Sequence, residues 1–408
     1  MIKKQTSAIR KRALSDAAAN KIKVIIAQSA RIISLMFMSG TLIQTFLASI
    51  GFSSDLIYIH SSILQAFNTA TIILFSGFAN RGSPIKRSAF SILPTALLFL
   101  MYVPLAIGRS ASWVSYILLT GVGVAQQISI GLCTVCEYKV PYYIYRVEEY
   151  GMMSAICGII SYALSLLIGA LISKLSTVYD FVDIMTVSFI ISAALTVVTF
   201  AATLKQKSLL SDKNNTPADE EKSKTSLLAL LHYPVFSHLI AANLLRGFAN
   251  GVITVLATVA LDLGYNETLT ASMVSVSAAA TMVGCGAFAV ISKRTNPALP
   301  IVIGSALVLS LPLLLINNSF LFLLIYAVLM FGRTFIDYGV PTMLIRIVPV
   351  EIAGSYNAWR MVLHQGGTFI ATAVAAWLPI PVLLILAAIF QIISGISYLF
   401  FGKKMMGK

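Results

Sequence analysis

Residues 181–204, FVDIMTVSFIISAALTVVTFAATL, are followed at once by residues 205–226, KQKSLLSDKNNTPADEEKSKTS. The first stretch is long and apolar enough to cross a hydrocarbon core of about 30 Å, which takes about 20 helical residues. The second stretch is rich in charged side chains, amides and Ser, which is typical of a linker. The junction therefore predicts a membrane-spanning helix that ends at a polar connection between two lobes.

The composition of the whole chain agrees with this reading. Of its 408 residues, 58% are hydrophobic and only 11% are charged, with a mean hydropathy of +0.88. A soluble domain carries about 25% charged residues. The pI of 9.6 reflects a shortage of acids rather than a high density of basic residues. These values exclude a soluble globule, a disordered chain, a disulfide-rich module and an ordinary nucleic-acid binder.

Apolar stretches of membrane-spanning length recur along the chain and predict twelve helices, six on each side of the linker. The predicted spans are 27–50, 55–79, 88–108, 112–136, 149–173, 181–204, 234–261, 268–291, 298–316, 319–346, 353–378 and 381–402. The predicted parts are a basic cytoplasmic tail 1–26, an N-terminal bundle 27–204, a cytoplasmic linker 205–233, a C-terminal bundle 234–402 and a tail 403–408.

Charge in the connections predicts the orientation. Most Lys and Arg residues fall in the tails, the linker and the loops on the same side, whereas the opposite side has only Arg109 and Lys174. Cytoplasmic loops carry the excess of Lys and Arg in membrane proteins. We therefore predict a multi-pass protein of the cell (plasma) membrane with both termini in the cytoplasm.

The loop after the second predicted span carries a family resemblance. It reads SGFANRGSPIKR over residues 76–87. Ala79 and Arg81 match the pattern G-x-x-A-D-R-x-G-R-K, Lys86 and Arg87 supply its basic end, and Asn80 replaces its acid. With twelve spans in two halves and a polar central loop, the chain resembles the major facilitator superfamily over essentially its whole length.

The resemblance implies an all-α membrane protein of two six-helix bundles and a central site that opens alternately to either side. It also implies that the third, sixth, ninth and twelfth helices lie outermost. The third, sixth and ninth predicted spans contain no Asn, Gln, Lys, Arg or His. Polar groups are expensive in hydrocarbon, so these helices are expected to face lipid and the polar ones an aqueous cavity. The candidate substrate-binding residues are Gln44, Gln126, Gln127, Arg246, Arg333 and His364.

Three charged residues are predicted near the middle of the membrane. Arg333 and Asp337 are spaced i,i+4 and could form an ion pair on one helix. Asp337 is then either a structural counter-ion or a proton carrier, and both readings remain open. That pairing leaves Arg246 without an acid at its depth, so the cavity would attract a carboxylate or phosphate. Alternatively, Arg246 bonds helix carbonyls, and the glutamines make only interhelical hydrogen bonds.

Gating residues are expected toward the cytoplasmic side. The candidates are Arg81, Glu137 and Arg360, although Arg360 could instead extend to the membrane interface. The four cysteines lie in apolar runs, and Cys133 and Cys136 lack a second pair or a nearby histidine, so we predict neither a metal site nor a cofactor. No phosphate-binding loop or nucleophile–base set is evident, which argues against an enzyme or an ATP-driven pump.

The sequence therefore predicts a secondary active transporter of a small solute, favours an organic anion, and allows proton coupling through Asp337. We expect the protein to be a monomer that interacts with the solute, the lipid bilayer and protons. We expect no binding of nucleic acid. A non-transporting membrane sensor or assembly partner on the same fold remains an alternative. A multidrug exporter, of this or another two-lobed fold, is a second alternative. The Gly-Pro antiporter motif of the fifth span does not support this alternative, because Gly151, Gly158 and Gly169 are not followed by proline.

Overall fold

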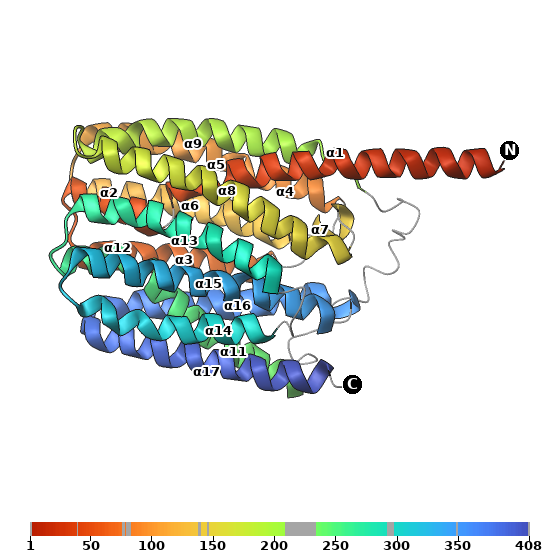
Figure 1. Ribbon diagram of the computed structural model, residues 1–408. Coiled ribbons are helices and arrows are strands. Elements are labelled where there is room, and N and C mark those ends of the chain that lie inside the picture. Colours follow the sequence, from red (N-terminus) through yellow and green to blue (C-terminus); the bar gives the residue numbers. More distant parts are fainter. Residues whose placement is uncertain are drawn as a thin grey trace.

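The chain forms a bundle of long helices (Figure 1). The structure, a computed structural model, describes residues 2–38, 40–75, 78, 83–137, 140–144, 147–208, 234–291, 298–347 and 350–406. Within these ranges the regular structure is entirely helical. The predicted all-α fold is confirmed.

The helices of residues 2–204 form what we call the first half. They are α1 (Ile2–Met36), α2 (Gly40–Ile50), α3 (Ser54–Leu74), α4 (Pro84–Ile92), α5 (Pro94–Gly108), α6 (Trp113–Glu137), α7 (Val140–Ile144), α8 (Val147–Leu175) and α9 (Phe181–Leu204).

The helices of residues 234–406 form the second half. They are α11 (Pro234–Thr254), α12 (Leu256–Asp262), α13 (Glu267–Ile291), α14 (Ala298–Leu307), the 3-10 helix η4 (Val308–Leu315), α15 (Ser319–Ile347), α16 (Val350–Ala375) and α17 (Ile380–Met406). Helix α1 begins and α17 ends at the same end of the bundle (Figure 1). We call this the terminal end, and the opposite one, where α2 ends and α13 begins, the far end.

Each predicted span coincides with helical structure, but the count of twelve is not confirmed. Ten helical segments of the described residues are long and apolar enough to cross a membrane. Helices α11 and α12, bent by 47° at Val255, make an eleventh if they form one span. Helix α16 is outside this set. Its 26 residues include Arg360, His364 and Gln365, which lower its hydropathy.

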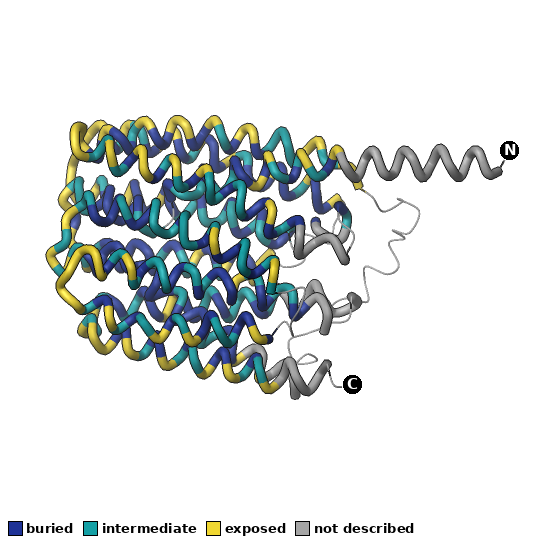
Figure 2. The backbone as a smooth tube through the Cα atoms, in the orientation of Figure 1, coloured by how far each residue is buried: buried dark blue, intermediate teal, exposed yellow. Residues whose placement is uncertain are grey.

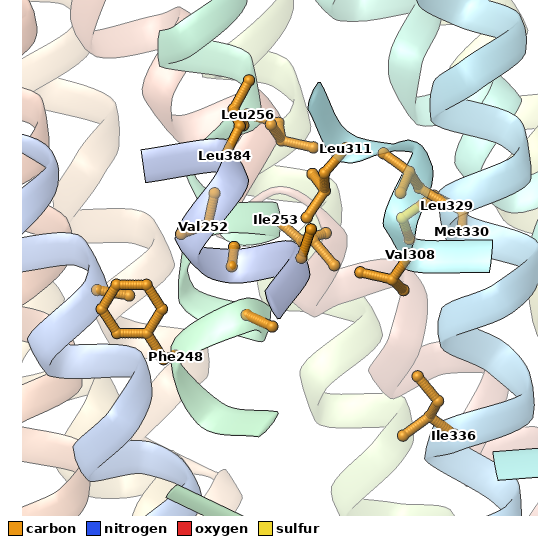
Figure 3. Close-up of a cluster of buried hydrophobic side chains, with 14 of the residues drawn as sticks. Phe248, Val252, Ile253, Leu256, Val308, Leu311, Leu329, Met330, Ile336 and Leu384 are labelled. Carbon is orange, nitrogen blue, oxygen red and sulfur yellow. The ribbon is translucent and has the colours of Figure 1, made fainter. Parts of the chain in front are cut away.

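Two large clusters of buried apolar side chains lie mainly one in each half. In the first half, the ring of Phe189 lies 5.3 Å from that of Phe46 and 4.9 Å from that of Tyr102, measured between centroids. In the second half, Phe248 and Val252 of α11 lie in one cluster with Leu311 of η4 and Leu384 of α17 (Figure 3). Because lipid tails are as apolar as these side chains, close packing rather than escape from water stabilises such cores.

The outer helices are those predicted to face lipid. Helices α5, α9 and α14, with α17, make their extensive helix contacts within their own half. Large apolar side chains such as Leu97, Ile107 and Val187 are exposed on them. Exposed positions recur along the helices at the outside of the bundle (Figure 2). The halves meet instead through α8 against α13 and α3 against α16, with α2 against α12 and α13. Of these inner helices, α2, α8 and α13 contribute to the lining of a central cavity.

Candidate site: a charged central cavity

Two broken helices meet where the halves face each other. In the first half α1 ends at Met36 and α2 begins at Gly40, and in the second half α11 ends at Thr254 and α12 begins at Leu256. Gly40 has a φ of +27°, and a Cβ on it would lie 2.6 Å from the Thr254 carbonyl oxygen. Only glycine allows this backbone angle and this approach together. The two breaks are thereby held against each other.

A cavity of about 470 Å³ adjoins these breaks. Helices α1, α2 and α8 of the first half and α11, α13 and α15 of the second half line it. Its volume is within the range of small-molecule sites, about 300–1,000 Å³. Interrupted helices in corresponding positions of two halves commonly mark a transporter's binding site, because unwound backbone is tolerated where it lines a cavity.

The charged side chains among the described lining residues both come from α15. Arg333 and Asp337 lie one turn apart, and Arg333 Nε donates a hydrogen bond of 3.3 Å to Asp337 Oδ2. The second carboxylate oxygen, Oδ1, accepts a hydrogen bond from Arg246 Nη2 of α11. The i,i+4 pair predicted from the sequence is present. The expectation that Arg246 has no acid at its depth is wrong, because Asp337 bridges both arginines.

The two ion pairs differ in their surroundings. The Arg246 side chain is 8% exposed, whereas those of Arg333 and Asp337 are 31% and 42% exposed where they line the cavity. Arg246 therefore lies behind the carboxylate and compensates it in a buried setting. Arg333 reaches the same carboxylate by a longer bond from the cavity side. Two guanidinium groups share one carboxylate, which leaves an excess positive charge at the cavity wall.

His364 and Arg360 lie near this charged group. Both are buried, and His364 is close enough to interact electrostatically with Arg246, Asp337 and Arg333 as well as with Arg360. Both belong to α16, which packs closely on α11. His364 is not among the residues that line the cavity. The burial of Arg360 differs from the interpretation in which its guanidinium extends to the membrane interface.

None of the three predicted glutamines is among the described residues that line the cavity. Gln44 joins the halves, because its Nε2 donates to the Thr254 carbonyl at 3.1 Å and its Oε1 accepts from Thr258 Oγ1 at 3.1 Å. Gln127 accepts a hydrogen bond of 2.9 Å from Asn68 on α3. Gln126 is fully buried in α6. For Gln44 and Gln127 the interhelical reading describes the observed contacts.

Of the three predicted gating residues, the two that the structure describes lie one in each half. Glu137, at the end of α6, forms an ion pair with Arg31 of α1, within the first half. Arg360 belongs to the second half. Arg81 lies outside the described residues.

Sequence reasoning missed the hydroxyl groups of the cavity. The lining hydroxyl residues are Thr41, Tyr162, Ser165, Thr254, Ser277, Thr281, Tyr326, Thr334 and Tyr338. Ser, Thr and Tyr are common throughout the predicted spans, so composition could not single these out. Their spacing gives a signal, because Tyr162 and Ser165 lie about one turn apart on α8 and face the same way.

The sequence of the chain matches the family described as the Major Facilitator Superfamily over residues 24–372. The chain belongs to this superfamily. No curated protein matches it in sequence.

Solved structures of similar fold agree with the family. A bacterial homologue of the iron transporter ferroportin, in its outward-facing state, has a TM-score of 0.66 and 12% identity, covering 95% of this chain and 99% of that one. A D-xylose–proton symporter has a TM-score of 0.65 and 11% identity, covering 91% and 96%. The ferroportin homologue with soaked iron gives 0.64 and 13%, covering 94% and 98%.

At such identities the likeness shows the fold alone, and the family gives the general activity. This major facilitator protein is a multi-pass membrane transporter, as the sequence predicted.

Proposed function

We propose that the protein is a secondary active transporter that moves a small organic anion by alternating access, with its two halves rocking about the central cavity. One observation carries the choice of substrate. Arg246 and Arg333 share the single carboxylate of Asp337 beside the cavity, so the wall keeps one uncompensated positive charge. A guanidinium binds carboxylate and phosphate groups through paired, charge-assisted hydrogen bonds.

Arg333 is the residue best placed to bind the anion. It lines the cavity, and its described bond to Asp337 uses Nε, which leaves the two terminal nitrogens of the guanidinium to face a ligand. Arg246 adds positive potential from behind, and the buried His364 lies close to it. Gln44, Gln126 and Gln127 then support the helices around the site rather than touch the solute.

Alternating access is supported by the contacts at the far end. Serine, threonine, tyrosine and glutamine side chains form hydrogen bonds between the halves there, through Gln44, Thr45, Ser49, Ser54 and Tyr58. These contacts hold the far end closed in this conformation. By the distribution of Lys and Arg, we assign the terminal end to the cytoplasm and the protein to the cell membrane. Glu137, Arg360 and Arg81 remain candidates for a gate on that side.

Proton coupling through Asp337 would follow from the shared carboxylate. Protonation removes the charge that holds Arg333, and the freed guanidinium then binds the anion. Proton and anion would be carried together, because each favours the presence of the other in the cavity.

The test is transport by purified protein in proteoliposomes, preceded by a thermal-shift screen of small organic anions and neutral compounds of matched size. A ligand of the folded state raises the melting temperature. We expect anions to stabilise the protein and to be carried, and Arg333→Gln to abolish both effects. Arg109→Gln is the matched control, because Arg109 pairs with Asp180 and Asp183 at the far end, away from the cavity.

Two results would contradict the proposal. Stabilisation by neutral compounds alone would exclude an organic anion as the substrate. Arg333-dependent binding without any flux would instead identify a sensor on a transporter fold.

A further inference from the structure

The two sides of the cavity differ in chemistry. The described charges on its lining, Arg333 and Asp337, belong to α15 of the second half. The first half contributes neutral residues, namely Ile32, Leu35, Met36, Gly40, Thr41, Tyr162 and Ser165. A solute held between the halves therefore meets an ionic group on one side and an uncharged wall on the other.

The uncharged wall has a continuous apolar part. Ile32, Leu35 and Met36 are spaced i, i+3 and i+4, so they lie on one face of α1. All three are partly exposed and line the cavity. When an apolar group of a ligand displaces water from such a surface, the hydrophobic effect makes the free energy of binding more favourable.

Tyr162 connects this wall to the charged pair. It lies near enough to interact electrostatically with Asp337 and Arg333, although it belongs to the opposite half. Its place is set one turn earlier on α8, where a Cβ on Gly158 would meet the Tyr338 hydroxyl of α15. This close approach of α8 to α15 brings the Tyr162 ring beside the anion-binding side of the cavity.

Resting on the anion transport proposed above, we infer that the substrate is a small carboxylate with an apolar body about the size of a six-membered ring. Its carboxylate binds Arg333, with the Tyr162 hydroxyl donating a hydrogen bond from the first half. Its body lies against Ile32, Leu35 and Met36. Both halves then contact one solute, which is what a substrate needs in order to couple their movement.

The test compares ligands in one series, using full-length protein in lipid nanodiscs at pH 7.5. The probes are acetate, cyclohexanecarboxylate, benzoate and benzamide, and the readouts are the melting temperature and the dissociation constant by calorimetry. Burial of each methylene group tightens binding roughly fourfold. We expect both ring carboxylates to bind at least about tenfold tighter than acetate, and benzamide to bind much more weakly than benzoate.

Variants separate the two parts of the site. Leu35→Ala should reduce the ratio of benzoate to acetate affinity about threefold or more, whereas Leu98→Ala, a partly buried leucine of α5 outside the cavity, should leave it unchanged. Tyr162→Phe should weaken both carboxylates about equally and preserve their ratio. Tyr179→Phe is its control, because Tyr179 is exposed at the far end.

The outcomes are distinguishable. If acetate binds as tightly as benzoate and both depend on Arg333, the inference of an apolar substrate body is wrong, but the proposal of anion transport is unaffected. If benzamide binds as tightly as benzoate, or if no carboxylate binds, both this inference and the proposal of an anionic substrate are wrong. An unchanged benzoate-to-acetate ratio in Leu35→Ala would overturn the assignment of the α1 wall.

Discussion

The Tyr58 hydroxyl on α3 donates a hydrogen bond of 2.8 Å to Asp262 Oδ2 on α12, across the boundary between the halves. Ser54 donates to the other oxygen of the same carboxylate. A second carboxylate, Glu267 on α13, accepts a hydrogen bond of 2.8 Å from Ser49 on α2. Acids of the second half thus bind hydroxyls of the first half at the far end. We call these five residues, Ser49, Ser54, Tyr58, Asp262 and Glu267, the far-end latch.

Asp262→Asn should shift the protein toward a conformation open at the far end. The amide nitrogen that replaces one carboxylate oxygen cannot accept a hydrogen bond from Ser54 or Tyr58. Each bond to a partly exposed charged group is worth about 1 kcal/mol, and about 1.4 kcal/mol changes a population ratio tenfold. Spin labels on cysteines introduced at Thr177 and Asn317, exposed positions of the two halves, should show a larger population of long distances.

The control for this shift is Asp180→Asn. Asp180 is also an acid of the far end, but it pairs with Arg109 within the first half at 2.8 Å. The distance distribution should therefore remain that of the unsubstituted protein. An Asp262→Asn distribution that matches the Asp180→Asn distribution would show that the latch does not hold the halves together.

Gly40→Ala tests the contact between the two broken helices. The new Cβ would lie 2.6 Å from the Thr254 carbonyl oxygen, at a φ of +27° that costs an L-residue about 1–2 kcal/mol. We expect a lower melting temperature and an opening of the far end like that expected for Asp262→Asn.

Gly121→Ala on α6 is the matched control, because nothing lies within 4 Å of its Cβ position. It should be neutral or slightly stabilising, since alanine favours helix by up to about 1 kcal/mol. Equal effects of the two substitutions would argue against a specific contact.

The sequence predicted which helices face lipid, and the reason is physical. A polar side chain against hydrocarbon costs enough to be excluded from helices such as α5 and α14, and the absence is visible residue by residue. For the same reason Arg246, Arg333 and Asp337 were predicted to face the interior of the bundle rather than lipid. The breaks at Gly40 and Val255 were not predicted, because apolar composition continues through both of them.

Contacts between helices could not be read from one helix at a time. The i,i+4 rule found the pair of Arg333 with Asp337, yet it could not show that Arg246 of α11 reaches the same carboxylate. For the same reason Gln44 was predicted to bind substrate, whereas its partners Thr254 and Thr258 lie more than 200 positions away in the sequence. Pairings at this separation depend on how the two halves pack.

Asp337→Ala should destabilise the protein through Arg246 rather than through Arg333. Loss of the carboxylate leaves the buried Arg246 guanidinium, 8% exposed, without a counter-ion, which costs about 3–5 kcal/mol. Arg333 is 31% exposed and bonds at 3.3 Å, so Arg333→Gln should cost at most about 1 kcal/mol. Unfolding free energies from denaturant titration in mixed micelles would compare the two variants.

A double variant gives the control for this asymmetry. Arg246→Met replaces the guanidinium by an apolar chain of similar length, so the pair Arg246→Met with Asp337→Ala should regain most of the stability lost in Asp337→Ala alone. If the double variant is less stable than either single variant, the buried pair is not the cause of the loss.

Asp337→Asn should separate transport from proton coupling. The amide resembles a protonated carboxyl in size and lack of charge, but it cannot bind and release a proton, so anion exchange should continue while accumulation driven by a pH gradient is lost. Proteoliposomes, assayed at a temperature where the variant remains folded, would measure counterflow and gradient-driven uptake side by side. Asp183→Asn, at the exposed far-end pair with Arg109, should retain both activities. Because Arg246 and Arg333 converge on this one carboxylate, gradient-driven accumulation that persists in Asp337→Asn would place the coupling proton on another group.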